Sequence, residues 1–284
     1  MSTPNPSLPD YSPSLASLSL AAWETNADYW DASITKHGNK YWRRLQEPSL
    51  ARLLGPSLSK PGGCKKALDL ATGNGLCARW LRSKGAEEVV ATDGCAAMLD
   101  IAKEHTVGDG EGGIRFRTVD VTSEGDLARL EEESKFDIVL MNMAAMDVPD
   151  LGPLARALPG LLAEGGVFVT TLLHPVFFTS GAARNIDVRF DPITGDCEVT
   201  RTKVIKEYMH VAPAMGIAVM GQPVKQPYFH RPMHELFTTF FKVGLVMDAM
   251  EELAFTEEDL EPRIESSSNY TQLPAVLAFR MRLP

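Results

Sequence analysis

The 284-residue sequence lacks the usual marks of secreted, metal-binding and membrane-spanning proteins. It has four cysteines, Cys64, Cys77, Cys95 and Cys197, without the paired spacing of metal ligands. We therefore expect reduced thiols, no metal and a cytoplasmic location. No run of about 18 apolar residues occurs, so we expect no membrane span. Residues 1–19 are rich in Pro and Ser and have no basic region before an apolar stretch, which predicts a disordered leader instead of a signal peptide.

Positive charge is also scarce. The chain has 28 Lys and Arg against 37 Asp and Glu, a net charge of −9, and no concentrated basic stripe. Nucleic-acid binding requires many cationic contacts with phosphates. We therefore expect no nucleic-acid partner.

What the sequence does contain is an apolar stretch, residues 67–75, that carries Asp69 and runs into a glycine turn. Gly73, Gly75 and Ala78, with Asp93 further on, also fit the dinucleotide-binding fingerprint. A carboxylate at the strand end would repel a pyrophosphate but would hold the cationic end of an amino acid. Residues 67–75 resemble motif I of the class I methyltransferases that depend on S-adenosylmethionine (SAM).

Three more apolar stretches predict strands that end in polar residues. Residues 89–92 lead to Asp93, residues 116–119 to Asp120, and residues 136–141 to Asn142. Ligands of open α/β sheets bind at the carboxyl ends of the strands, so these residues predict a cofactor cradle.

Several further segments are similar to the UbiE-like and methyltransferase-11-like small-molecule branch of that family. They are residues 142–150, 162–168, 174–175, 228–232 and 249–255. The resemblance implies an α/β fold: a doubly wound, Rossmann-like, seven-stranded sheet with an antiparallel last strand, an N-terminal helical cap and an inserted substrate cap after strand 5. We expect one domain over residues 20–284, divided into the helical cap (20–55), the cofactor-binding core (62–174), the inserted cap (175–231) and a C-terminal helix with strands (232–284).

The resemblance also implies SAM as the cofactor and assigns its binding residues. Ala71 departs from the pattern, because many members have glycine there. The predicted cofactor-binding residues are Asp69, Ala71, Thr72, Gly73, Asn74, Asp93, Gly94, Met98, Asp120, Val121, Asn142, Met143 and Tyr41. A core contact is the alternative for Met98, and packing is the alternative for Tyr41.

Three residues are candidates for the acceptor side. His174 follows the fifth predicted strand and could act as a general base, because histidine titrates near neutral pH. Its alternative role is to orient the following turn. His230 and Tyr228 lie where the inserted segment returns and could line the pocket or simply pack under the cap. For Asp147, before Val148 and Pro149, we expect a role at the start of a helix.

The sequence therefore predicts a SAM-dependent methyltransferase that acts on oxygen or nitrogen of a small, partly apolar metabolite. The alternatives are a SAM-binding enzyme of the same fold that catalyses a cyclisation or rearrangement, and a SAM-binding protein without catalysis. Val211, Met215, Met220 and Phe229 of the inserted segment suggest an acceptor with apolar surface.

Overall fold

The computed structural model describes residues 12–107, 112–178 and 182–284. Its centre is a seven-stranded sheet in the order β10-β11-β5-β4-β1-β2-β3. The strands are β1 (Lys66–Leu70), β2 (Glu88–Asp93), β3 (Ile114–Thr118), β4 (Phe136–Asn142), β5 (Leu162–Leu173), β10 (Val246–Leu253) and β11 (Val276–Arg282). The first five are parallel, and β11 runs antiparallel to both β5 and β10. The predicted doubly wound sheet with an antiparallel last strand is confirmed.

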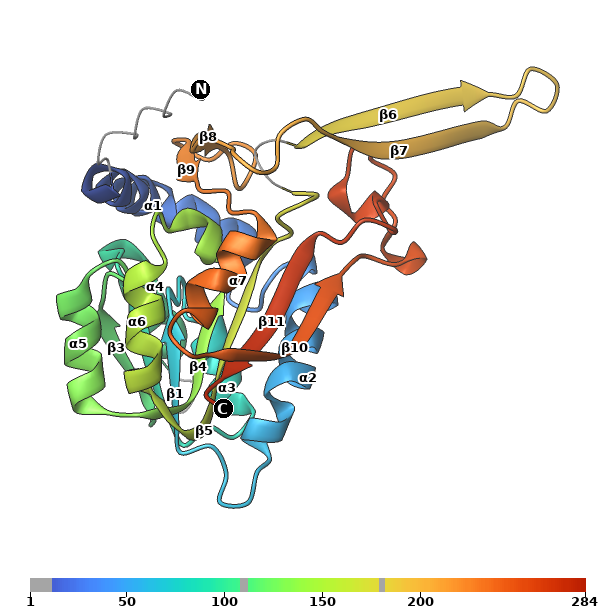
Figure 1. Cartoon of the computed structure of the whole chain (residues 1–284). Helices are drawn as coiled ribbons and strands as arrows, with labels where there is room; N and C mark the ends of the chain where they lie inside the picture. Colours follow the sequence, from blue (N-terminus) through green and yellow to red (C-terminus); the bar gives the residue numbers. More distant parts are fainter. Residues whose placement is uncertain (1–11, 108–111, 179–181) are drawn as a thin grey trace, which may run out of the picture.

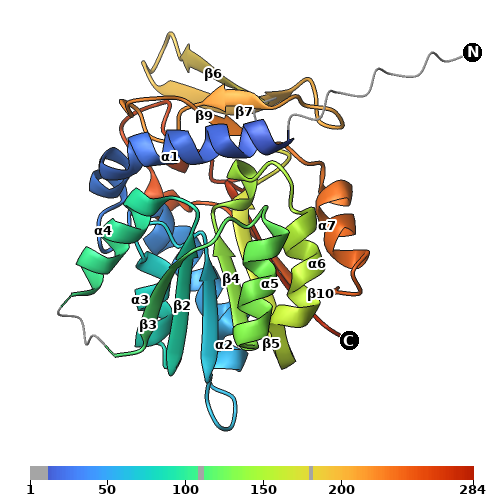
Figure 2. The same cartoon turned by 90° about the vertical axis from the view of Figure 1, so that its left-hand side faces the viewer.

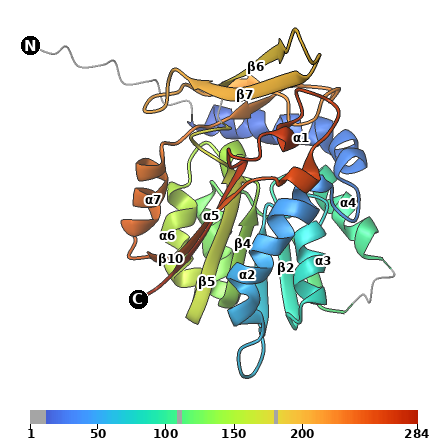
Figure 3. The ribbon, with the colours of Figure 1, turned by 90° about the vertical axis from the view of Figure 1, so that its right-hand side faces the viewer.

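Helices cover both faces of this sheet. Successive side chains of a strand point to opposite faces, so a strand with apolar side chains throughout packs against helices on both sides. In β1, Leu68 and Leu70 pack against α5, α6 and α7, whereas Ala67 packs against α2 and α3. Figures 2 and 3 show these two helical layers. The helices are α2 (Glu47–Leu58), α3 (Leu76–Ser83), α4 (Ala96–Thr106), α5 (Glu124–Glu133), α6 (Gly152–Leu161) and α7 (Met233–Phe241).

A long helix, α1 (Ser12–Ile34), crosses the carboxyl ends of the strands (Figure 2). The prediction of a disordered leader is wrong for residues 12–19, and residues 1–11 lie outside the described part. The Pro and Ser content was misleading, because proline is tolerated in the first turn of a helix. Ser19 is buried and donates a 2.8 Å hydrogen bond to the Asp147 carbonyl, which fixes this end of α1 over the sheet.

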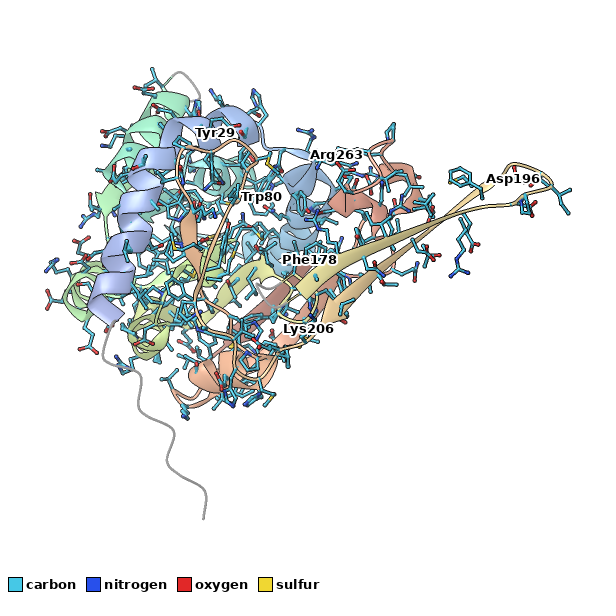
Figure 4. All side chains as sticks on the ribbon, turned by 90° about the horizontal axis from the view of Figure 1, so that it is seen from above. Tyr29, Trp80, Phe178, Asp196, Lys206 and Arg263 are labelled. Atoms are coloured by element: carbon cyan, nitrogen blue, oxygen red, sulfur yellow. The ribbon has the colours of Figure 1, made fainter. Side chains whose placement is uncertain are left out.

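The segment between β5 and α7 forms two small antiparallel pairs. One consists of β6 (Ala182–Phe190) and β7 (Cys197–Ile205), and the other of β8 (Ala214–Gly216) and β9 (Gln226–Tyr228). The β6–β7 hairpin projects from the body of the protein (Figure 1). Figure 4 shows Asp196 at its far end and Lys206 at its base.

Short helical turns complete the fold. They are the π-helical turn Trp42–Gln46 and the 3-10 turns Ala145–Asp147, Glu257–Asp259 and Ser267–Asn269. Among the described residues, no helix is long and apolar enough to cross a membrane.

Candidate functional site

A cavity of about 720 Å³ lies at the carboxyl ends of β1, β2, β4 and β5, beneath α1 and the inserted segment. All thirteen predicted cofactor-binding residues line it: Asp69, Ala71, Thr72, Gly73, Asn74, Asp93, Gly94, Met98, Asp120, Val121, Asn142, Met143 and Tyr41. Residues far apart in the sequence meet here because parallel strands all end at the same edge of a sheet.

Asp69 lies on the floor of the cavity near the end of β1. Its carboxylate is buried and accepts a hydrogen bond from the Thr72 hydroxyl. The positive charge of Arg79 also acts on this carboxylate. Burial raises the pKa of Asp69 to about 7, against the opposing effect of the Thr72 hydrogen bond. A cationic ligand group would stabilise the charged form, since opposite charges lower the pKa of a carboxyl.

The turn after β1 is strained at Ala71, whose φ is +52°. This left-handed conformation suits glycine, because a Cβ there crowds the following carbonyl oxygen. It explains why glycine is frequent at this position in the resembling family. The strained turn directs the Gly73 amide toward Asp93, to whose carboxylate it donates a 2.9 Å hydrogen bond.

Asp93, at the end of β2, is held by two backbone amides. Gly73 N and Cys95 N each donate a 2.9 Å hydrogen bond to a different carboxylate oxygen. Burial raises the pKa of Asp93 to about 6, and these amide contacts oppose the shift. Each oxygen keeps capacity for a second donor, such as a sugar hydroxyl.

The wall beyond Asp93 combines apolar side chains with one further carboxylate. Met98 and Val121 are buried and line the cavity. Asp120 Oδ1 accepts hydrogen bonds from the Thr122 amide (2.8 Å) and hydroxyl (2.7 Å). Such a surface suits a flat ring with an amino group at its edge.

α1 closes this side of the cavity. A Cβ on Gly94 would come within 2.7 Å of Leu20 Cδ2, so a larger residue there would require the end of the Leu20 side chain to move. The Asn74 amide donates a 2.7 Å hydrogen bond to Asp31 of α1, and His105 of α4 also contacts that carboxylate. These polar contacts attach α1 to the turn after β1.

Asn142 and Tyr41 lie at the other end of the cofactor wall. The Asn142 amide donates to Gln46 (3.1 Å) and accepts from the Thr171 hydroxyl (2.6 Å), so its orientation is fixed. The Tyr41 ring packs edge-on against Phe255 with 5.0 Å between centroids, and burial raises the Tyr41 pKa. Met143, with φ of +55°, turns the chain away from β4.

Of the three candidate catalytic residues, His174 does not line the cavity. It is 1% exposed, Nε2 lies 2.8 Å from Glu252 of β10, and Nδ1 accepts a hydrogen bond from Val176 N. Burial lowers its pKa, and Glu252 opposes this. The geometry favours the alternative role, in which His174 orients the turn after β5.

His230 and Tyr228 do line the cavity. His230 Nε2 lies 2.6 Å from the Tyr208 carbonyl, and because a carbonyl can only accept, Nε2 carries the proton. Nδ1 is then an acceptor, and it is buried without a partner among the described residues. Burial raises the pKa of Tyr228 far above its usual value, with a smaller effect of Asp147, so the phenol remains a donor.

Comparisons with known proteins agree with this geometry. Residues 68–170 match the family model described as a methyltransferase domain. A SAM-dependent methyltransferase from Mesorhizobium loti aligns with 87% of this chain and 100% of its own at 21% identity and a TM-score of 0.61. The chain therefore has the class I methyltransferase fold, and residues 68–170 are similar to a methyltransferase domain. The predicted resemblance is confirmed.

Two further solved structures with this fold contain the cofactor or its product. The complex of DhpI with S-adenosylhomocysteine (SAH) is 19% identical, with 96% and 98% of the two chains covered and a TM-score of 0.56. The glycopeptide N-methyltransferase MtfA in complex with SAM is 14% identical, with 83% and 93% covered and a TM-score of 0.52. Curated proteins gave no match.

The matched part of the methyltransferase domain contains Asp69, Asp93 and Asp120 but ends before the inserted segment. The inserted segment must therefore be described from this chain alone. Asp147, which the sequence interpretation did not assign to the site, lies within the matched residues. Asp147 is 8% exposed, lines the cavity and accepts a 3.0 Å hydrogen bond from the Gln226 amide. Burial raises its pKa to about 7. A buried acid with a strongly shifted pKa in a cleft is a candidate functional group.

The backbone around Asp147 is fixed by the returning segment. Arg231 is half-buried and donates to the carbonyls of Ala145 (3.1 Å), Val148 (2.6 Å) and Pro149 (2.8 Å). Phe229 N donates to the Met146 carbonyl at 2.8 Å. The expected helix-starting role of Asp147 is wrong: its carboxylate faces Gln226 and the cavity.

Proposed function

We propose that this protein is a SAM-dependent methyltransferase that methylates an oxygen or nitrogen of a small, partly apolar metabolite. The observation that supports it most is the convergence of Asp69, Asp93 and Asp120 with a fourth acid, Asp147, on one cavity of about 720 Å³. Three acids suit the cofactor, and the fourth lies where an acceptor would enter.

The residues present fit SAM. Asp69, a buried carboxylate that lines the cavity, would hold the ammonium group. Asp93 would accept the ribose hydroxyls, while Met98 and Val121 would contact the adenine and Asp120 its amino group. When bound, SAM supplies a methyl group on a sulfonium, which is a good leaving group.

The protein then has to position the acceptor and remove a proton. With SAM bound, the residues of the cavity would hold the acceptor's nitrogen or oxygen in line with the methyl group, the thioether would leave with its electron pair, and the proton lost by the acceptor would pass to a base of this chain. Alignment supplies most of the acceleration, because the displacement requires an in-line approach at about 3 Å.

We assign the removal of the acceptor's proton to Asp147. An acid with a pKa of about 7 is half ionised at neutral pH, which suits a general base. Gln226 fixes the orientation of its carboxylate. Tyr228, which stays protonated, would donate a hydrogen bond to the acceptor, and His230 Nδ1 would accept one.

The acceptor is expected to have apolar surface. Met215, Ile217, Val219 and Phe229 line the cavity on the side of the inserted segment. Val211 and Met220 do not line it, so that part of the sequence interpretation is not supported.

The test is to incubate the protein with SAM and a library of small metabolites and to detect products that gain one methyl group by mass spectrometry. Asp147→Asn is the informative variant, and Asp150→Asn, an exposed acid that does not line the cavity, is the matched control. We expect SAH formation with wild type and the control, and little with Asp147→Asn. A product that keeps its original mass would instead indicate a cyclisation or rearrangement, and binding without any turnover would indicate a non-catalytic protein.

A further inference from the structure

Two basic residues face each other at the base of the β6–β7 hairpin. Arg184 of β6 and Lys203 of β7 are direct partners in the antiparallel register, so their side chains are on the same face. Both line the cavity. They belong to the inserted segment and lie outside the part matched by the family model.

This arrangement is unfavourable in the absence of a ligand. Like charges directly opposite each other in a sheet are destabilising. Neither residue forms an ion pair with a carboxylate in the described part of the chain; Arg184 donates to the Glu265 carbonyl at 3.1 Å. Within the described residues, these contacts are with a carbonyl and with aromatic rings, and no carboxylate neutralises the two charges.

Lys203 is also partly removed from water. Its Nζ lies 3.9 Å from the centroid of the Phe178 ring and 5.3 Å from that of Tyr270. Burial lowers the Lys203 pKa to about 8, and Arg184 lowers it further. A bound anion would offset both the repulsion between Arg184 and Lys203 and the burial of the Lys203 charge, because it would supply opposite charge to both side chains.

We infer that Arg184 and Lys203 form a subsite for a carboxylate or phosphate group of the methyl acceptor. This inference rests on the proposed function and adds a substrate class to it: a metabolite with an anionic group at one end and a nucleophilic nitrogen or oxygen near Asp147. The four acids at the cavity disfavour an anion elsewhere, so the anionic group is directed to the hairpin.

The test uses simple probes, because the acceptor is not identified. Phenyl phosphate, benzoate and neutral benzyl alcohol are titrated calorimetrically into protein saturated with SAH. The variants are Lys203→Met and Arg184→Gln, and Lys206→Met is the control, since Lys206 is exposed in the same segment but does not line the cavity. We expect wild type and the control to prefer at least one anion by about tenfold, as charge-assisted hydrogen bonds would give. Both variants should lose this preference and keep their SAH affinity within about threefold.

The other results overturn either the inference or the proposed function on which it rests. An equal affinity for anions and alcohol in wild type, or an anion preference that survives in both variants, excludes the subsite. A loss of SAH affinity in the variants assigns the pair to the cofactor's own carboxylate. Failure of wild type to bind SAH contradicts the proposed function instead, and the subsite is then judged by the same titrations without SAH. Loss of a like-charge contact should not unfold the variants, and their melting temperatures verify this.

Discussion

The Gln226 amide donates a 3.0 Å hydrogen bond to the Asp147 carboxylate, and both side chains are buried at the cavity wall. The two residues are separated by 79 positions in the sequence. Gln226 begins β9, whose return path also carries Tyr228 and precedes His230. This contact joins the segment after β4 to the inserted segment, and it gives the acceptor side its acid.

The pH dependence of turnover should report Asp147. Because burial raises its pKa to about 7, the base form increases as pH rises through that value, and kcat/KM should increase with it. Asp147→Asn should lower kcat/KM by about 10²- to 10⁴-fold and abolish this increase of kcat/KM with pH. His230→Gln separates the two candidates, since burial lowers the His230 pKa below its usual range. If the increase of kcat/KM near pH 7 persists in Asp147→Asn but disappears in His230→Gln, the histidine is the group that removes the acceptor's proton.

Without ligand, stability should fall as the pH rises from about 5 to 7. The pKa values of Asp69 and Asp147 are raised to about 7 and that of Asp93 to about 6, so the folded protein keeps protons that the unfolded chain releases. Each group contributes a slope of up to about 1.4 kcal/mol per pH unit between its unfolded and folded pKa. Urea unfolding of wild type and Asp147→Asn between pH 5 and 8, with linear extrapolation to zero urea, measures how the free energy of unfolding changes with pH. The variant should show the shallower slope, and equal slopes would contradict the shifted pKa of Asp147.

Ala71→Gly should stabilise the protein. The substitution relieves a left-handed alanine, which costs about 1–2 kcal/mol, and the flexibility of glycine in the unfolded chain cancels part of that gain. We expect a rise of about 0.5–1 kcal/mol in the free energy of unfolding, with SAH affinity retained. Ala96→Gly, at an exposed alanine in the first turn of α4, is the control and should lower stability. A loss of stability in Ala71→Gly would show that the strain at this turn has no energetic weight.

His174→Gln tests the positioning role of this histidine. Because His174 connects the end of β5 to Glu252 of β10, its replacement should lower the free energy of unfolding by about 1–3 kcal/mol. Turnover by the folded fraction and SAH affinity should stay near wild type. Glu252→Gln, which removes the charge of the partner, should cause a smaller loss of the same kind. A tenfold or larger loss of turnover at unchanged stability would restore His174 as a catalytic candidate.

The cofactor half of the site could be predicted from the sequence, because its geometry is local. Asp69, Asp93 and Asp120 lie at or just after the ends of short apolar strands, and the sheet brings such ends to one edge. The acceptor half depends on contacts between distant segments. Asp147 gains its environment from Gln226, and Arg184 meets Lys203 only through the register of the hairpin. No local pattern encodes either relationship.

The N-terminal cap shows the same limit. Residues 12–19 have the composition of a flexible leader, yet Ser19 contacts the backbone of Asp147 and Leu20 packs on Gly94. Tertiary packing, which composition does not report, decides that this segment is helical.

The measurement that tests the central claim most directly is calorimetric titration of SAM and SAH into wild type, Asp93→Asn and Asp100→Asn, the last an exposed acid of α4 that serves as control. The cradle of Asp69, Asp93 and Asp120 predicts micromolar binding of both compounds by wild type and the control. It also predicts a loss of about 1–3 kcal/mol in Asp93→Asn, because the ribose hydroxyls lose a charged acceptor. Absence of binding by wild type, or unchanged affinity in Asp93→Asn, would contradict the account.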